Sequence, residues 1–202
     1  TGIDWNQDTI LEFGVILEDT DKQLPFEELP KFSCLLRHPK YIGDPFALAM
    51  HKEIFIELSK PDGESEETII DHDKLGEKFY YWLIEQNRKS ETKFLIKAPL
   101  NEGVIIENNF QLPIMITVAG KNFGTFDARF LENLEGFSKF IKFHQRVIDP
   151  AALYFDNNKD KQMPNLSTCK ERAGLSDTRI AHRTIQDAWD IIQVLRKRMY
   201  SK

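Results

Sequence analysis

The sequence predicts a single α/β domain, because short apolar runs of strand length alternate with longer amphipathic segments along its 202 residues. Residues 114–119, IMITVA, form the clearest strand, and the turn that follows leads into a helix marked by phenylalanines. Residues 9–18 form a second, largely apolar run. Fifteen phenylalanines supply bulk for a core, and a chain of this length buries roughly two thirds of its surface.

The first half of the chain is expected to begin with two antiparallel strands, residues 9–18 and 31–36, joined by a turn that contains proline. Residues 46–58 carry apolar side chains at helical spacing, and residues 71–87 have a wide apolar face at steps of three and four. Residues 59–67 are acidic and contain proline and glycine, which is typical of a surface loop.

The second half is expected to contain the strand at 114–119 and four helices. The turn Gly120-Lys121-Asn122 leads into a helix that reaches about Leu134. Asp149 and Pro150 fit an N-cap and a first helical position. Residues 165–173 form a short helix that Gly174 ends, and residues 183–199 form the last helix. Residues 90–109 show no clear period, and we interpret them as two short strands or an insertion around 90–110 in a single domain over 1–202.

Composition excludes several classes of protein. The 27 Lys and Arg against 32 Asp and Glu give a net charge of −5, which argues against coating nucleic acid by bulk positive charge. We expect no membrane span, because no apolar run approaches the roughly 18 residues that a bilayer requires. Cys34 and Cys169 are too few for a disulfide framework or a cysteine zinc site. We expect both to be buried in a protein of a reducing compartment, the cytoplasm.

The last predicted helix contains one candidate site. On one continuous helix His182 and Asp187 would point about 140° apart, but with His182 in the preceding loop both can face one spot. We expect Asp187 at the edge of the inward-facing stripe and Asp190 in water. The stripe is Ile185, Ala188, Trp189, Ile192, Leu195 and Met199. The alternative is an Asp favoured only by the helix dipole and a polar surface His.

Asp127 is the second candidate. It follows the strand 114–119 through a short turn, which places it near the carboxyl edge of a sheet, where open α/β folds bind ligands. The alternative is again an acid favoured by a helix start. Asn122 fits a turn residue that tolerates the left-handed conformation. His38, His51, His72 and His144 have no partner pattern and are expected to be structural.

Three segments of the chain resemble the motifs of the DEDD superfamily of 3′-to-5′ exonucleases. TGIDWNQDTILEFGVILED is similar to the stretch after the first acidic motif, in which Asp-x-Glu-Thr-Thr-Gly precedes a strand. AGKNFGTFDARFL resembles the second motif, Asn-x-x-x-Phe-Asp. AHRTIQDAWDII resembles the third, and its His in place of Tyr indicates the DEDDh branch. The three segments occur in the family's order across nearly the whole chain.

The resemblance implies a ribonuclease H-like fold, with a mixed five-stranded sheet flanked by helices. In the family, the Asp and Glu of the first motif stand immediately before the position of Thr1. We expect them to precede Thr1 in a longer chain; the alternative is a form that lacks these two metal ligands. The implied reaction is hydrolysis of DNA or RNA phosphodiester bonds from the 3′ end, with release of nucleoside monophosphates. Two divalent cations held by carboxylates neutralise charge and activate water in such reactions, and oxygen ligands suit Mg²⁺ or Mn²⁺.

The resemblance also implies roles for single residues. Asp187 would bind metal directly, and Asp127 directly or through water. His182 would be the general base, since its unperturbed pKa is near 6.5. Thr1 and Asn122 match positions that line the pocket of the terminal nucleotide. Arg179 and Arg183 would contact phosphates, or would be an ordinary solvated pair.

The expected partner is therefore a nucleic acid 3′ end, with a single strand favoured. The sequence does not distinguish DNA from RNA and leaves the oligomeric state open. The alternative function is a catalytically inactive ribonuclease H-like domain that binds nucleic acid or acts as a scaffold.

Overall fold

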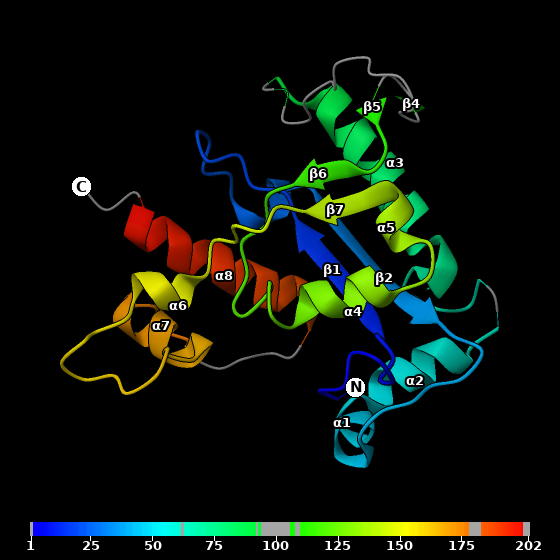
Figure 1. Ribbon diagram of the computed structural model, residues 1–202, viewed down its shortest axis with the longest axis horizontal. Coiled ribbons are helices and arrows are strands. Elements are labelled where there is room, and N and C mark those ends of the chain that lie inside the picture. Colours follow the sequence, from blue (N-terminus) through cyan, green and yellow to red (C-terminus); the bar gives the residue numbers. More distant parts are fainter. Residues whose placement is uncertain are drawn as a thin grey trace.

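The computed structural model describes residues 2–61, 63–91, 93, 106–107, 110–177 and 183–199. The chain has the expected α/β architecture, with helices packed around small sheets (Figure 1). Strand β1 (Glu12–Ile16) pairs antiparallel with β2 (Lys31–Arg37), as predicted. A short third strand, β3 (Ile69–Asp71), pairs parallel with β2 and completes a sheet of order β1-β2-β3.

The strand predicted at 114–119 is shorter than expected, and it is part of a separate sheet. Strand β6 (Ile114–Ile116) pairs parallel with β7 (Ile141–Phe143), and a parallel bridge between Ala119 and Ile148 prolongs this pairing. Strands β4 (Ile106–Glu107) and β5 (Phe110–Gln111) form a small antiparallel pair. The described residues thus form one three-stranded and two two-stranded sheets, where a single five-stranded sheet was expected.

The helix predicted over 46–58 consists of two helices, α1 (Pro45–Met50) and α2 (Lys52–Ser59). The chain departs from helical geometry at His51, with φ −101° and ψ 27°. Asp44 caps α1, because its Oδ1 accepts hydrogen bonds from the backbone nitrogens of Phe46 and Ala47, at 2.9 and 3.2 Å.

The remaining helices lie near the predicted positions, except that the short helix at residues 137–140 was not predicted. Helix α3 (Leu75–Lys89) begins after a 3₁₀ turn, η2 (His72–Lys74), and another 3₁₀ turn, η1 (Phe26–Glu28), precedes β2. The others are α4 (Asp127–Asn133), α5 (Phe137–Phe140), α6 (Pro150–Leu153), α7 (Leu166–Arg172) and α8 (Thr184–Met199). Asp149 caps α6 through Ala151 N at 2.8 Å, as expected. Asn165 caps α7 through Thr168 N at 2.8 Å.

The main core lies between the β1-β2-β3 sheet, the β6-β7 pair and α3. Phe13 of β1 packs edge-on against Phe79 of α3, with ring centroids 5.1 Å apart. Ile114 and Ile141, from the second sheet, belong to the same cluster of buried residues. The two sheets therefore share one core, although no strand ladder joins them within the described part of the chain.

A smaller core joins α6, α7 and α8. Ala151, Cys169 and Val194 are its buried members, one from each helix. Both cysteines of the chain are free and buried, as predicted. Within the described residues, no helix is long and apolar enough to cross a membrane.

The orientation of α8 corrects one prediction. Asp190 does not face water: it is 2% exposed and contacts Lys170 of α7 at 2.6 Å. Met199, which was expected in the buried stripe, is 50% exposed. The buried residues of α8 are Asp190, Ile191, Ile192, Val194 and Leu195. The helix buries a second face because α6 and α7 cover the side that the sequence alone assigned to solvent.

Candidate functional site

A cavity of about 510 Å³ lies between β1, the turn after β6, α4 and the first turns of α8. Its walls are mainly apolar, and a few polar side chains reach it from different elements. These polar residues are Thr9, Glu12, His51, Lys121, Asp127, Thr184 and Asp187. A mostly apolar cavity with a few convergent polar groups is the usual form of a ligand site.

Asp127 and Asp187, the two acids predicted as metal ligands, both line this cavity. Asp127 is the first residue of α4, and Asp187 lies in the first turn of α8. Asp187 N donates a hydrogen bond to Arg183 O at 2.9 Å, which fixes the backbone of this turn. The fold therefore brings the two acids, far apart in the sequence, to one space.

Asp127 is an exposed residue at the cavity, but many protein atoms lie around its carboxyl group. The resulting desolvation raises the pKa of Asp127 from 3.8 to about 6, and a hydrogen bond from its own backbone N–H opposes the rise. A carboxyl group with such a pKa changes its charge near neutral pH. A nearby cation would favour its ionised form.

Two predicted site residues, His182 and Thr1, lie outside the described residues, as does Arg179. Their neighbours in the chain are described. Gly2 lines the cavity, and so does Thr184, two residues after His182.

Asn122 occupies the turn between β6 and α4, with the left-handed φ of 58° that the sequence suggested. Its backbone N–H donates to Asp149 Oδ2 at 2.9 Å, and its Oδ1 accepts from Lys121 Nζ at 2.5 Å. Lys121 and Phe123 line the cavity on either side of Asn122, whereas Asn122 itself is exposed. The geometry thus gives Asn122 a role in shaping the turn.

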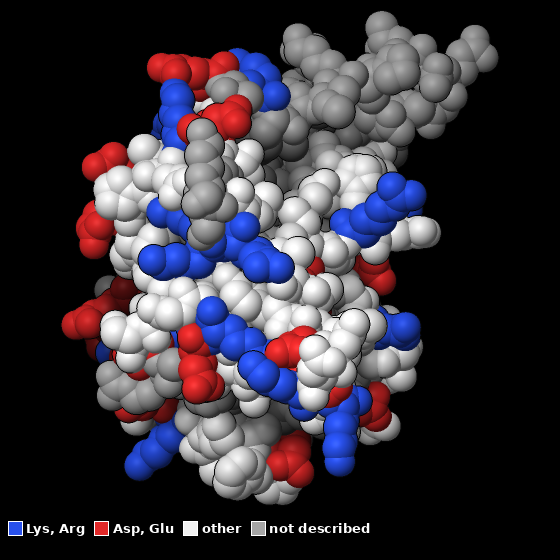
Figure 2. Space-filling model, turned by 90° about the vertical axis from the view of Figure 1, so that its left-hand side faces the viewer, with Lys and Arg blue, Asp and Glu red and all other residues white. Residues whose placement is uncertain are grey.

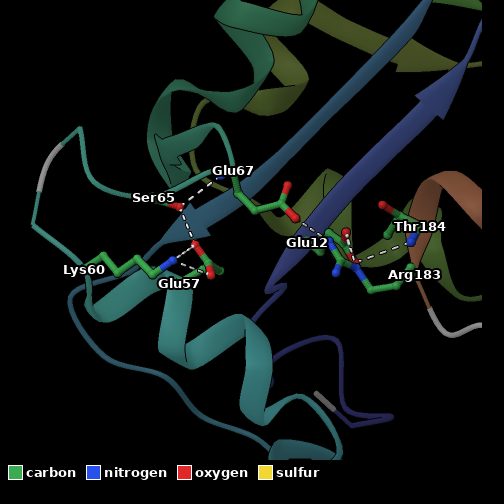
Figure 3. A network of polar contacts seen from close by, with 7 residues as sticks. All are labelled: Glu12, Glu57, Lys60, Ser65, Glu67, Arg183 and Thr184. Carbon is green, nitrogen blue, oxygen red and sulfur yellow. Dashed lines mark hydrogen bonds and ion pairs between the residues drawn. The ribbon is translucent and has the colours of Figure 1, made fainter.

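Arg183 has two carboxylate partners rather than an open position for a phosphate. Its Nε lies 3.0 Å from Glu12 Oε1, and its Nη2 lies 2.7 Å from Glu67 Oε1. Figure 3 shows the guanidinium between these two side chains, which come from β1 and from the segment before β3. The bond to Glu67, together with the charge of Glu12, raises the pKa of Arg183, so it stays a cation.

Glu12 is a site residue that sequence reasoning missed. Its side chain is 7% exposed, and its Oε2 also accepts from Thr184 N at 3.4 Å. The available signal was a charged residue inside the otherwise apolar strand 9–18, where burial of a carboxylate requires a partner. Phe126, 40% exposed beside Asp127, is a second cavity residue that the sequence did not single out.

Gly14 of β1 sets how closely α8 approaches the sheet. A Cβ at this position would lie 2.1 Å from Thr184 Oγ1 and 2.7 Å from Thr184 Cβ. Thr184 Oγ1 is buried and makes no hydrogen bond among the described residues. Because no side chain intervenes, the start of α8 rests directly on β1 and turns Asp187 toward the cavity.

Basic side chains are concentrated elsewhere. On the face that carries α6, α7 and the end of α8, Lys and Arg form a band (Figure 2). The last turn of α8 contributes Arg196, Lys197 and Arg198. The dipole of α8 favours cations at this end, and Arg196 is bound to Glu18 through two contacts of 2.7 Å.

The histidines predicted to be structural have separate settings. His38 and His72 stack with ring centroids 4.5 Å apart, and His38 Nε2 lies 2.8 Å from Ile10 O. Burial lowers the pKa of His38. His51 differs from this pair because it lines the cavity.

The described residues contain no group of three or more His, Cys, Asp or Glu side chains arranged to hold a metal ion. Asp127 and Asp187 provide two carboxylates at one cavity. That number suits one hydrated Mg²⁺ ion, which commonly binds one or two carboxylates together with substrate phosphates and water.

The sequence matches no protein-family model, no curated protein and no solved structure at a significant level.

Proposed function

We propose that the protein is a metal-dependent 3′-to-5′ exonuclease of the DEDDh type, acting on single-stranded DNA or RNA. The observation that carries the proposal is the convergence of Asp127 and Asp187 on one cavity. The motif resemblance selects these two acids independently of the fold. Two acids selected only by sequence motifs would not be expected to line the same cavity by chance.

The proposed cofactors are two Mg²⁺ or Mn²⁺ ions. Asp127 and Asp187 would hold them, together with the two acids that the resemblance assigns to the positions before Thr1. Gly2, the first residue that the structure describes, lies in the cavity wall. When bound, the ions would stabilise negative charge on the phosphate and lower the pKa of an attacking water.

The protein side chains would have separate tasks. Asp127, with its pKa of about 6, would release a proton when a cation binds. His182 would accept the proton of the attacking water. Lys121 reaches the cavity as a cation and suits a substrate phosphate, while the exposed ring of Phe126 offers an apolar surface to a base.

The proposed fold is ribonuclease H-like. The antiparallel pair β1-β2 and the parallel pair β6-β7 support it. The parallel pairing of β3 with β2 differs from three successive antiparallel strands. A single continuous sheet would also require β6 to pair with β1. The two free, buried cysteines support a reducing compartment, for which we propose the cytoplasm.

The test uses the full-length protein with DNA and RNA oligonucleotides labelled at the 5′ end, with Mg²⁺, with Mn²⁺ and with a chelator. We expect stepwise shortening from the 3′ end that the chelator stops. An Asp187→Asn variant serves as the inactive control. Binding of oligonucleotides without any hydrolysis would contradict the proposal and favour the inactive binding domain.

A further inference from the structure

Helix α8 is fastened to β1 by an ion pair at each end. Arg183 binds Glu12 at the start of β1, and Arg196 binds Glu18 just after its end. Between the two arginines the helix advances about 20 Å at roughly 1.5 Å per residue. Between the two glutamates the extended chain also advances about 20 Å, at roughly 3.3 Å per residue. The spacing of the two ion pairs therefore matches on both elements.

The pair at the start of α8 differs from the other by its position and its connections. Glu12 lines the cavity, whereas neither Glu18 nor Arg196 does. Arg183 also binds Glu67, so one guanidinium joins α8 to β1 and to the segment that leads into β3. The start of α8 is thus held to strand β1 and to the segment before β3.

Arg183 is connected directly to Asp187 through the main chain. The carbonyl oxygen of Arg183 accepts the hydrogen bond from Asp187 N at 2.9 Å. Thr184, between them, donates its backbone N–H to Glu12 and rests against Gly14. Movement of Arg183 would therefore shift the turn that presents Asp187.

The partners of Arg183 are themselves fixed. Glu67 N donates to Ser65 Oγ at 3.1 Å, and Ser65 Oγ donates to Glu57 Oε2 at 2.9 Å. Lys60 binds the Glu57 carboxylate at 2.7 and 2.8 Å. Figure 3 shows this chain of contacts from α2 to the start of α8. A network of this kind restricts the positions available to each member.

We infer that Arg183 is a positioning residue, which holds Asp187 at the cavity by binding Glu12 and Glu67 across the sheet. This inference rests on the proposed function for its effect on catalysis, but the anchoring itself does not. Arg183 acts through Asp187 and does not contact the substrate. Arg196, at the opposite end of the same helix, stabilises the fold without affecting the cavity.

The experiment compares Arg183→Gln, Arg183→Lys and the matched control Arg196→Gln in the full-length protein. The first measurement is hydrogen exchange in α8. We expect Arg183→Gln to accelerate exchange about tenfold at Asp187 and in the next turn, since a charge-assisted anchor is lost. Arg196→Gln should accelerate exchange only in the last turns, and Arg183→Lys should restore part of the protection.

The second measurement is steady-state hydrolysis of a single-stranded oligonucleotide. Arg183→Gln should lower kcat by between about tenfold and a hundredfold with little change in KM, because small displacements of a reacting group have effects of this size. Arg196→Gln should keep the wild-type kcat. An increased KM with unchanged kcat would overturn the inference and place Arg183 on a substrate phosphate.

The two proposals fail separately. If the wild-type protein hydrolyses no oligonucleotide, the proposed function is wrong, and hydrogen exchange alone then decides whether Arg183 anchors Asp187. Unchanged exchange at Asp187 in Arg183→Gln would overturn the anchoring whatever the activity.

Discussion

Lys170 of α7 and Asp190 of α8 form an ion pair of 2.6 Å, and their side chains are only 4% and 3% exposed. Gln186, one turn before Asp190, adds a contact from its Nε2 to Asp190 Oδ1 at 3.4 Å. Taking two charges out of water is unfavourable. Each charge is tolerated in the interior only because the other compensates it, so removal of one partner should destabilise the folded protein.

Asp190→Asn should therefore destabilise the protein by about 3 to 5 kcal/mol, because the Lys170 ammonium stays buried without its carboxylate. Urea unfolding at neutral pH measures the change. Glu85→Gln is the control, since it removes an exposed pair with Lys89 and should change stability by less than about 0.5 kcal/mol. A double replacement, Lys170→Met with Asp190→Leu, should recover much of the loss. An equal loss of stability in Asp190→Asn and Glu85→Gln would contradict the expectation that the buried ion pair matters more than the exposed one.

Gly14→Ala should destabilise the protein by about 1 to 3 kcal/mol, because the new methyl group overlaps Thr184. The start of α8 has to move away from β1, which should also reduce any activity that depends on Asp187. Thermal unfolding and oligonucleotide hydrolysis measure the two effects. Gly124→Ala is the control, since its Cβ would meet Val147 Cγ2 at an ordinary 3.4 Å. Similar behaviour of both variants would show that the close approach at Gly14 is unimportant.

The raised pKa of Asp127 predicts a definite pH dependence. Because its pKa is about 6 in the folded protein and 3.8 for the unperturbed group, the folded state binds more protons between these values. The contribution of Asp127 to stability is therefore favourable below about pH 4 and is lost as pH rises through 6. Asp127→Asn should be more stable than the wild type at pH 8 and lose this advantage at pH 4.

Carboxyl-carbon NMR measures the same property directly. We expect Asp127 to titrate near pH 6 in the metal-free protein and at lower pH when Mg²⁺ is added, since a cation favours the ionised form. A titration near 3.8 without metal would show that the cavity does not desolvate this carboxyl group.

Asp187→Asn and His182→Ala should each remove most of the exonuclease activity. The loss expected for a general base is about 10² to 10⁴-fold in rate. Oligonucleotide hydrolysis measures it, with His144→Ala as the control because His144 is exposed and is not among the cavity-lining residues. Full activity of His182→Ala would remove His182 from the mechanism.

The sequence predicted those features that depend on local chemistry. The apolar run before the Asp19 turn, the cap at Asp149 and the left-handed Asn122 are all set by residues within a few positions. Strands β3 and β7 were not predicted, since three residues are too few to show a period. Pairing with a distant strand, rather than local preference, makes these segments extended.

The environment of Asp190 could not be predicted for a related reason. A helix with an apolar face toward β1 leaves its opposite face to solvent unless another element covers it. The chain gives no local sign that α7 would deliver Lys170 to that face. The common cavity of Asp127 and Asp187 likewise depends on contact between α8 and β1, which only the folded chain provides.

The two faces of α8 have one more consequence. Asp187 and Ile191 line the cavity, while Val194 belongs to the small core with α6 and α7 and Asp190 holds Lys170. Helix α8 thus separates the cavity from the small core that it forms with α6 and α7. If α6 or α7 packed less tightly against α8, the helix would be held less firmly behind Asp187. A substitution in α6 or α7 should therefore make the position of Asp187 at the cavity less ordered.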